Sequence, residues 1–232
     1  MARYLLVGAS SQIGQAVHQL LLAQHHEVVT TARDDQKINP HYILDATDFT
    51  AVDDVFEQAG IFDGVVNFAG SLLLKPAHLT TFAEWQHTIA SSLTTSFAIV
   101  RAAGRFMTQG GSVVLIGSAA AEIGLANHEA IAAAKAGIVG LALSASATYA
   151  HQGLRFNVVE PGLTETPLTV ALTQNELIKK GSIAMHPLGR LGQPLDIAQA
   201  IVFFLQPENN WITGQHLAVD GGLSRLKLRA KV

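Results

Sequence analysis

Short runs of hydrophobic residues alternate along this chain with longer segments whose apolar positions repeat at helical spacing. Seven of the short runs have the length of buried strands and are bounded by turn residues. They lie at Tyr4–Val7, Glu27–Thr31, Tyr42–Leu44, Gly64–Phe68, Ser112–Ile116, Arg155–Val159 and His216–Val219. Helices are predicted over Ile13–Gln24, Phe49–Ala59, Phe82–Met107, Glu129–Ala150 and Pro194–Leu205. Buried strands separated by helix-length crossovers predict an α/β fold, a three-layer, Rossmann-type doubly wound parallel sheet of about seven strands.

The pattern predicts a single domain over residues 1–232, because no repeat, low-complexity segment or linker interrupts it. Residues 163–190 are the least regular segment and follow a strand, so we expect a mobile helical flap there. Residues 225–232 form a basic tail. We expect that tail to be solvated, because its four cations do not make a binding groove. They are Arg225, Lys227, Arg229 and Lys231.

The amino-acid composition limits the classes of partner that the protein is expected to bind. Charged residues make up only 14% of the chain and the net charge is -3, which gives no reason to expect nucleic acid or a membrane as partner. The absence of cysteine excludes disulfides, thiolate nucleophiles and Cys-based zinc sites. No metal is expected, because the ten histidines show no metal-ligand spacing. No signal peptide is recognisable, and the longest apolar stretch, Ala136–Ala147, is too short to span a bilayer. We therefore expect a soluble, cytoplasmic protein that acts on a small molecule.

Residue types that carry chemistry gather directly after the predicted strands. These positions are Gly8–Gly14, Arg33, Asp45, Asn67–Gly70, Ser118 and Pro161–Thr166. In an open parallel sheet, ligands bind beyond the carboxyl ends of the strands. The shared placement therefore predicts one site at one edge of the sheet.

The first of these segments has the features of a phosphate-binding turn. Gly8 ends a strand and permits a tight turn, and Gly14 permits close packing of the following helix. The N–H groups at the helix start and the helix dipole favour a pyrophosphate, which predicts a bound dinucleotide. Gln12 stands where a third glycine is more usual. The expected contacts are Gly8, Ser10, Ser11, Gln12, Ile13 and Gly14.

The order and spacing of the motifs resemble the short-chain dehydrogenase/reductase family over nearly the whole chain. The motifs are the glycine turn, Asn67–Gly70, Ser118, Lys135, Pro161–Gly162 and Val219–Gly222. The resemblance implies a bound NAD(P) and a homo-oligomer, either a dimer or a tetramer. It also implies that Asp45, with Ala46 beside it, lies at the adenine. The further cofactor contacts it implies are Asn67, Ala69, Gly70, Lys135, Pro161, Gly162 and Thr166.

The end of the second strand favours NADP(H) over NAD(H). An acidic residue there would bind the ribose 2′-hydroxyl and repel a 2′-phosphate. Ala32 takes that place, and Arg33 follows with a guanidinium that can pair with a phosphate. The alternative is a solvated arginine paired with Asp34 or Asp35.

The catalytic residues that the resemblance implies are only half present. Ser118 and Lys135 stand where the family has its serine and lysine. Ile131 takes the place of the family's tyrosine, and Ser92 takes the place of its asparagine. Isoleucine has no titratable proton and cannot be a general acid. Tyr149 is the nearest tyrosine, but it is too far along the helix to share the face of Lys135.

Another group would have to supply the proton. His128, Ile131 and Lys135 are spaced i, i+3 and i+7, which places them on one helical face and makes His128 a candidate donor. The alternative is a histidine that faces solvent or packs. Glu129 and His87 are weaker candidates.

Three functions remain open at this point, because a fold alone does not fix function. The first is an NADPH-dependent oxidoreductase with a non-standard proton donor, acting on an apolar carbonyl or alcohol. The second is a cofactor-binding pseudoenzyme or regulatory subunit, and the third is a non-redox enzyme such as a lyase or isomerase. The segments expected to line the substrate cavity are mostly apolar: Leu72–Leu74, Ala119–Leu125 and 163–190.

Overall fold

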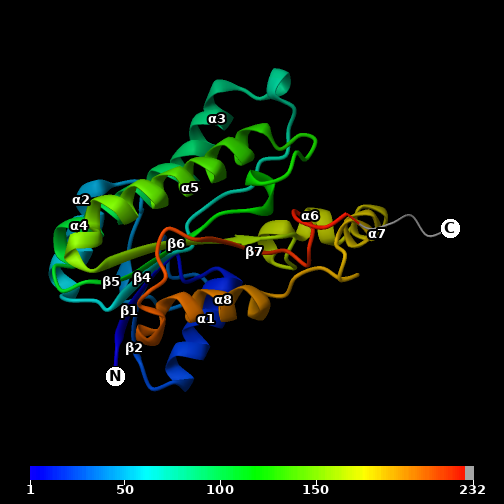
Figure 1. Cartoon of the computed structure of the whole chain (residues 1–232). Coiled ribbons are helices and arrows are strands. Elements are labelled where there is room, and N and C mark those ends of the chain that lie inside the picture. The colour runs from blue at the N-terminus through cyan, green and yellow to red at the C-terminus, as the bar shows by residue number, and fades with distance from the viewer. Residues whose placement is uncertain (228–232) are drawn as a thin grey trace.

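A computed structural model describes residues 1–227 and shows a seven-stranded parallel sheet between two layers of helices (Figure 1). The strand order is β3-β2-β1-β4-β5-β6-β7. The strands are β1 (Arg3–Val7), β2 (Glu27–Ala32), β3 (Tyr42–Ile43), β4 (Gly64–Asn67), β5 (Gly111–Ile116), β6 (Leu154–Pro161) and β7 (His216–Val219). The helices are α1 (Gln12–Ala23), α2 (Phe49–Ala59), α3 (Phe82–Ile89), α4 (Thr95–Phe106), α5 (Glu129–Tyr149), α6 (Val170–Thr173), α7 (Glu176–Met185) and α8 (Pro194–Leu205). The Rossmann-type fold expected from the pattern is confirmed.

Alternating residues along each strand face the two helical layers. On β1, Leu5 and Val7 pack in the core under α2, α4 and α5, whereas Tyr4 and Leu6 pack in the core under α1 and α8. This is the period of two that a pleated strand imposes. Because both faces are covered, the strands are mostly apolar instead of alternating regularly with polar residues, although a few buried polar residues such as Thr30 and Asn157 lie within them.

The crevice of the sheet opens between β1 and β4, where the strand order reverses. Gly8 leaves β1 with a φ of +74°, and a Cβ atom there would lie 3.2 Å from the backbone nitrogen of Ala69, which follows β4. Only glycine fits both the conformation and the close approach. The two turns therefore meet at the switch point of the sheet, where ligands bind in this class of fold.

The helix expected over Phe82–Met107 is present over Phe82–Phe106, but it is not α-helical throughout. A π-helical turn over Ala90–Thr94 separates α3 from α4, with Ser92 at its centre. The hydroxyls of Thr95 and Ser96 donate back to the carbonyl of Ser92 at 3.1 and 2.8 Å. Such bonds compete with the helical ladder and bend it, and π turns are often found at functional sites.

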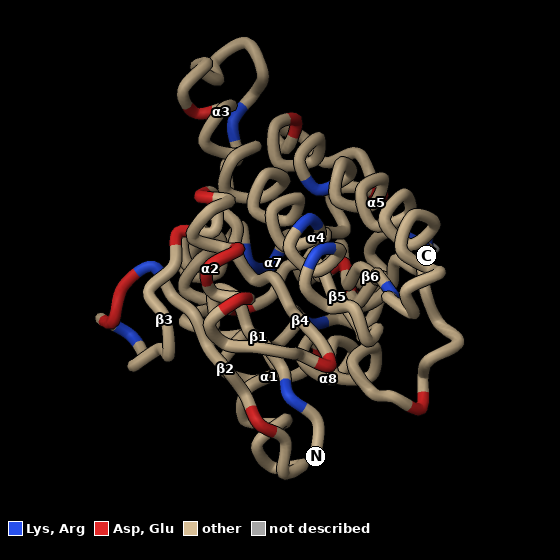
Figure 2. Tube along the Cα trace, turned by 90° about the vertical axis from the view of Figure 1, so that its left-hand side faces the viewer, with Lys and Arg blue, Asp and Glu red and all other residues tan. Residues whose placement is uncertain are grey.

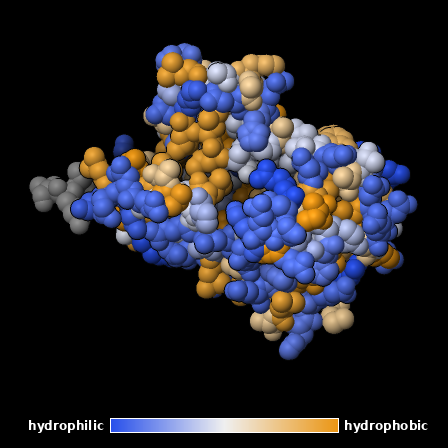
Figure 3. Space-filling view, turned by 180° about the vertical axis from the view of Figure 1, so that it is seen from behind, coloured by the Kyte–Doolittle hydropathy of each residue, from blue (hydrophilic) through white to orange (hydrophobic). Residues whose placement is uncertain are grey.

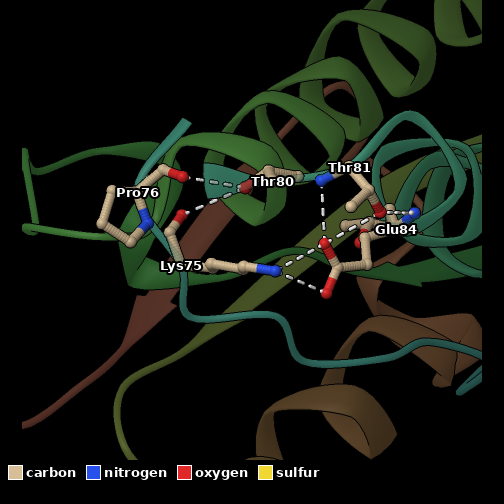
Figure 4. Close-up of polar contacts among 6 residues, drawn as sticks. Lys75, Pro76, Thr80, Thr81 and Glu84 are labelled. Atoms are coloured by element: carbon tan, nitrogen blue, oxygen red, sulfur yellow. Dashed lines mark hydrogen bonds and ion pairs between the residues drawn. The ribbon is translucent and has the colours of Figure 1, made fainter. Parts of the chain in front are cut away.

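The corner that leads into α3 is fixed by a capping box and an ion pair (Figure 4). Thr81 and Glu84 cap the helix reciprocally, and Lys75 Nζ lies 2.8 Å from a Glu84 oxygen. Hydrogen bonds from Lys75 and from Thr81 lower the pKa of Glu84 to about 2. The backbone N–H of Lys75 also donates to Asn127 at 2.8 Å, which ties this corner to the loop before α5.

Residues 163–190 contain α6 and α7, so the expected helical flap is present, and its mobility stays a prediction. Figure 3 shows hydrophobic surface in the hollow between this segment and the projecting corner with α3. Arg225 is exposed, as expected of a solvated tail, and it also forms an ion pair with Glu122 at 2.6 Å. Arg229 and Lys231 lie outside the described residues.

Residues 129–152 form a helical segment that is long and apolar enough, by length and composition, to cross a membrane. This segment exceeds the apolar stretch considered in the sequence. Its α5 part packs on β6 and against α4, and 44% of its apolar window is buried. It belongs to one of the two helical layers of the domain, and its buried residues, such as Ala134 and Ile138, face the sheet and the neighbouring helices.

Candidate functional site

The turn between β1 and α1 has the local geometry of an anion cradle. Ser11 is the N-cap of α1, and its Oγ accepts a hydrogen bond from the N–H of Gly14 at 3.0 Å. A Cβ on Gly14 would lie 3.0 Å from the carbonyl oxygen of Ala9, so the turn packs directly on the helix. The first turn of α1 carries no acidic side chain to repel an anion. These features fit a pyrophosphate at the helix N-terminus.

A pocket of about 370 Å³ joins this turn to the flap. It is lined by Gln12, Glu165, Thr166, Pro167 and Val170. Two residues predicted to contact the cofactor from distant parts of the sequence, Gln12 and Thr166, therefore lie on one surface. A larger pocket, of about 510 Å³, involves residues beside the amino ends of β1 and β4, among them Met1 and Asp63, and none of the predicted site residues.

The turn after β4 is held by the side chain of Asn67. Its Oδ1 accepts from the N–H of Ala69 at 3.1 Å, and its Nδ2 donates to Thr95 and Ser96 at the start of α4. Asn67 is buried, so its side chain shapes the turn and any contact with a ligand falls to the backbone.

Lys135 of α5 reaches the end of β5. Its Nζ donates to the carbonyl of Ile116 at 2.8 Å, and only 7% of the residue is exposed. Within residues 1–227 no carboxylate pairs with it. Burial lowers the pKa of Lys135 to about 8. An ammonium group in such a setting can both bind a polar ligand and release a proton near neutral pH.

Ser118 follows Ile116 closely and caps a short 3₁₀ turn. Its Oγ accepts from the N–H of Ala120 at 3.2 Å, as a purely structural serine would. Accepting that bond leaves the hydroxyl proton of Ser118 available to a ligand. Both catalytic residues predicted from the sequence therefore lie just beyond β5.

The two positions that depart from the family's catalytic pattern, Ile131 and Ser92, are also buried. Ile131 is 3% exposed and Ser92 is fully buried. A Cβ on Gly70 would lie 3.5 Å from Lys135 Nζ and 3.8 Å from Ser92 Oγ, so three segments of the chain converge there. Among the described residues, Ser92 Oγ has no hydrogen-bond partner. A buried unpaired hydroxyl is unfavourable for folding, which is typical of a site that has a further partner in its working state.

The other candidate proton donors are placed less favourably. Tyr149 packs on Gly104 and against Phe156. It lies fourteen residues beyond Lys135, about 21 Å along the helix. His128 precedes the first residue of α5, and its Nδ1 lies 2.7 Å from the carbonyl of Ala126. It is therefore the N-cap residue of α5, and its imidazole is already engaged by the preceding loop.

Arg33 lies exposed directly after β2. Figure 2 shows charges of both signs in the loop between β2 and β3. Neither Asp34 nor Asp35 forms an ion pair with Arg33 in the described part of the chain. Hydrogen bonds from Thr47 lower the pKa of Asp45, and Arg33 adds to that effect. Arg33 is thus left available for an anionic ligand, and Asp45 is ionised.

The segment after β6 is closely packed. A Cβ on Gly162 would lie 2.8 Å from the Cα of Asp220 and 2.9 Å from Nε2 of His186, so only glycine fits beside Pro161. Thr166 is the N-cap of the next 3₁₀ turn, and its N–H donates to Thr169 Oγ1 at 3.1 Å.

The structure also gathers three residues that the sequence analysis did not connect: Glu122, Glu160 and His216. One side-chain ligand atom from each lies within 4.8 Å of the others. They come from three different segments, and none of the pairs has a short sequence spacing. Only the register of β5, β6 and β7 brings them together.

Comparisons with known proteins agree with this geometry. A family model described as Enoyl-(Acyl carrier protein) reductase matches residues 8–224. The 3-oxoacyl-(acyl-carrier-protein) reductase FabG of Salmonella typhimurium is 33% identical over 239 residues, which cover 94% of this chain and 96% of FabG.

Solved structures are similar over the whole fold. The ligand-free aldohexose dehydrogenase of Thermoplasma acidophilum superposes with a TM-score of 0.90 at 27% identity, covering 100% of this chain and 97% of its own. ElxO with NADP bound has a TM-score of 0.88 at 26% identity and covers 96% of this chain and 99% of its own. A tyrosine-to-phenylalanine variant of ElxO has been solved with NADPH bound.

Proposed function

Because the chain belongs to the short-chain dehydrogenase/reductase family, we propose that it is an NADPH-dependent oxidoreductase that uses a proton donor other than the family's tyrosine. The observation that carries the proposal is the buried Lys135, held at the end of β5 beside Ser118. The substrate we propose is an apolar carbonyl compound or alcohol, since the hollow beside the flap is hydrophobic (Figure 3). A homo-oligomer is part of the same proposal.

The residues present fit a nicotinamide dinucleotide. Gly8 and Gly14 let the turn pack closely on the backbone after β4 and on α1, and Ser11 caps the helix through the N–H of Gly14. Gln12 and Thr166 share the pocket beside them. The unpaired Arg33 supports NADPH over NADH, because a guanidinium forms a forked bond with a 2′-phosphate.

Replacing Arg33 by alanine is expected to weaken NADPH binding by roughly 10–100-fold, because a hydrogen bond to a charged group contributes about 1.5–3 kcal/mol. NADH binding should change little, since it lacks the 2′-phosphate. Both affinities follow from titrations of nicotinamide fluorescence. Lys37→Ala, a change to an exposed cation in the same loop, is the control and should leave both affinities unchanged. Equal losses for NADPH and NADH would contradict the assignment.

Lys135 is the proton donor in this proposal. Bound NADPH would supply the hydride to the carbonyl carbon. Ser118 then donates a hydrogen bond to the carbonyl oxygen, and Lys135 transfers a proton from Nζ to that oxygen, forming the alcohol. The lysine is left as a neutral amine and regains its proton from water. Its lowered pKa makes this release favourable at neutral pH.

The variant Lys135→Arg tests that role. Arginine keeps the positive charge but does not release a proton, so turnover should fall by at least about 10²-fold while NADPH still binds. His128→Ala should leave the rate within a factor of a few, because the imidazole of His128 is already engaged by the loop before α5. Turnover is measured over a panel of carbonyl compounds. Loss of turnover in His128→Ala, with Lys135→Arg active, would assign the proton to the histidine instead.

A cofactor-binding pseudoenzyme is the second candidate, and it is favoured by two observations: the family's tyrosine position is a buried Ile131, and the Ser92 hydroxyl is unpaired. It would bind NADPH tightly but show no turnover on any carbonyl until both positions were changed together, as Ile131→Tyr with Ser92→Asn. Failure to bind any nicotinamide would contradict both candidates.

A further inference from the structure

The residues Glu122, Glu160 and His216 form a side-chain cluster next to the catalytic edge. Glu122 follows the short turn that begins at Ser118, Glu160 is near the end of β6, and His216 begins β7. Nδ1 of His216 lies 3.2 Å from Oε2 of Glu160 and 3.4 Å from Oε1 of Glu122. None of the three residues has a role in the cofactor or hydride chemistry proposed above.

The carboxyl group of Glu160 is buried and only partly hydrogen-bonded. It is 0% exposed, and its Oε1 has no hydrogen-bond partner within the described residues. A buried carboxylate that is not fully paired is strongly unfavourable unless a cation compensates it.

The two distances from His216 Nδ1 to the carboxylate oxygens match those around a small dication, and the two oxygens lie within 4.8 Å of each other. Zinc bonds of about 2.0–2.2 Å in a tetrahedral site place neighbouring ligand atoms about 3.3 Å apart. The two observed distances, 3.2 and 3.4 Å, are of this size. Arg225 Nη2 lies 2.6 Å from the other oxygen of Glu122, where it orients that carboxylate as outer-shell groups of metal sites do.

We propose that Glu122, Glu160 and His216 bind one divalent transition-metal ion of the zinc type, with a fourth position open to water or ligand. Mixed imidazole and carboxylate donors suit this class of ion, whereas Mg²⁺ requires octahedral oxygen coordination. The proposal revises the expectation from sequence that the chain has no metal site.

The site would connect three strand ends close to Ser118. A Cβ on Gly117 would lie 2.8 Å from Cγ of Glu160, so this side chain packs against the backbone that leads into Ser118. An ion held by the cluster joins that turn to β6 and β7. It therefore fixes the Ser118 turn against the strand that continues into Pro161 and Gly162.

The test is a Zn²⁺ titration of the full chain, freed of metal by chelation, against a competing chromophoric chelator. Wild type is expected to bind one ion per chain. Glu160→Gln and His216→Gln should each weaken that binding by more than about tenfold, since losing a ligand exceeds the loss of an outer-shell partner. His151→Gln, a change at an exposed histidine elsewhere, should bind as wild type does. Mg²⁺ should not compete.

Thermal unfolding with and without Zn²⁺ provides the second measurement. Zn²⁺ should raise the melting temperature of wild type and of His151→Gln but not that of Glu160→Gln or His216→Gln, because an ion bound only by the folded chain stabilises it. Melting in chelator shows whether each variant is folded. Absence of one-to-one binding in wild type, or equal binding in all four proteins, would overturn the proposal.

Discussion

Lys135→Met is expected to stabilise the cofactor-free protein at pH 7 by about 1–3 kcal/mol while lowering NADPH-dependent turnover by at least about 10²-fold. Burial lowers the pKa of Lys135 from 10.5 to about 8, a difference of about 2.5 units. At 1.36 kcal/mol per unit this is about 3 kcal/mol of unfavourable burial. Methionine removes the charge at similar volume but leaves the carbonyl of Ile116 without its donor, which costs about 1 kcal/mol.

The same shift gives the pH dependence of stability. Below pH 8 Lys135 is protonated in both the folded and the unfolded chain, so the penalty is fully present. Between about pH 8 and 10.5 only the unfolded chain holds the proton, and the free energy of unfolding therefore rises with pH. Above 10.5 the penalty is gone. Lys135→Met should lack this rise.

Urea unfolding at several pH values between 6 and 10 measures both effects. Lys37→Met, at an exposed lysine, is the matched control and should follow wild type at every pH. A Lys135→Met protein that is less stable than wild type at pH 7 would show that the ammonium is compensated by contacts other than the carbonyl of Ile116. Greater stability with lost turnover is the trade-off expected of a residue kept for function.

Local patterns were sufficient to predict most of the fold. The helices α2 and α8 begin and end where the sequence places them, because Asp48 caps the first and Pro194 starts the second. The strands are recognisable because both faces of a parallel sheet are buried, which leaves continuous apolar runs. Their order along the chain then places the strand ends, and most of the candidate site, at one edge.

The features that sequence reasoning missed depend on contacts between distant segments. The family resemblance marked Ser92, but nothing in the periodicity of its neighbours signals the π turn around it. Glu160 precedes Pro161 in a mostly apolar strand, where a single acidic residue forms no recognisable metal-binding motif. Its partner His216 is 56 positions away and meets it only through the pairing of β6 with β7. In the sequence Arg225 likewise looks like part of a basic tail, and only the structure shows its contact with Glu122.

Restoring the tyrosine at position 131 is expected to raise turnover of the best carbonyl substrate by about 10²-fold. A positioned general acid typically contributes 10²–10⁴ in rate, and the lower value applies because Lys135 already supplies a proton in the wild type. Ile131 lies on α5 four residues before Lys135. A phenol there would be one helical turn from the ammonium, which would lower its pKa and favour proton transfer.

Ile131→Phe is the matched control, because it adds nearly the same volume without the hydroxyl. Ile131 is 3% exposed, so either larger side chain is expected to cost about 1–3 kcal/mol in stability. If both variants lose the same stability and only Ile131→Tyr gains turnover, the gain comes from the phenolic proton. Its pH profile should also change, since release from the phenol replaces release from Lys135. Equal rates in wild type, Ile131→Phe and Ile131→Tyr would mean that proton transfer does not limit the reaction, and position 131 would then be a packing position whose substitution leaves the chemistry intact.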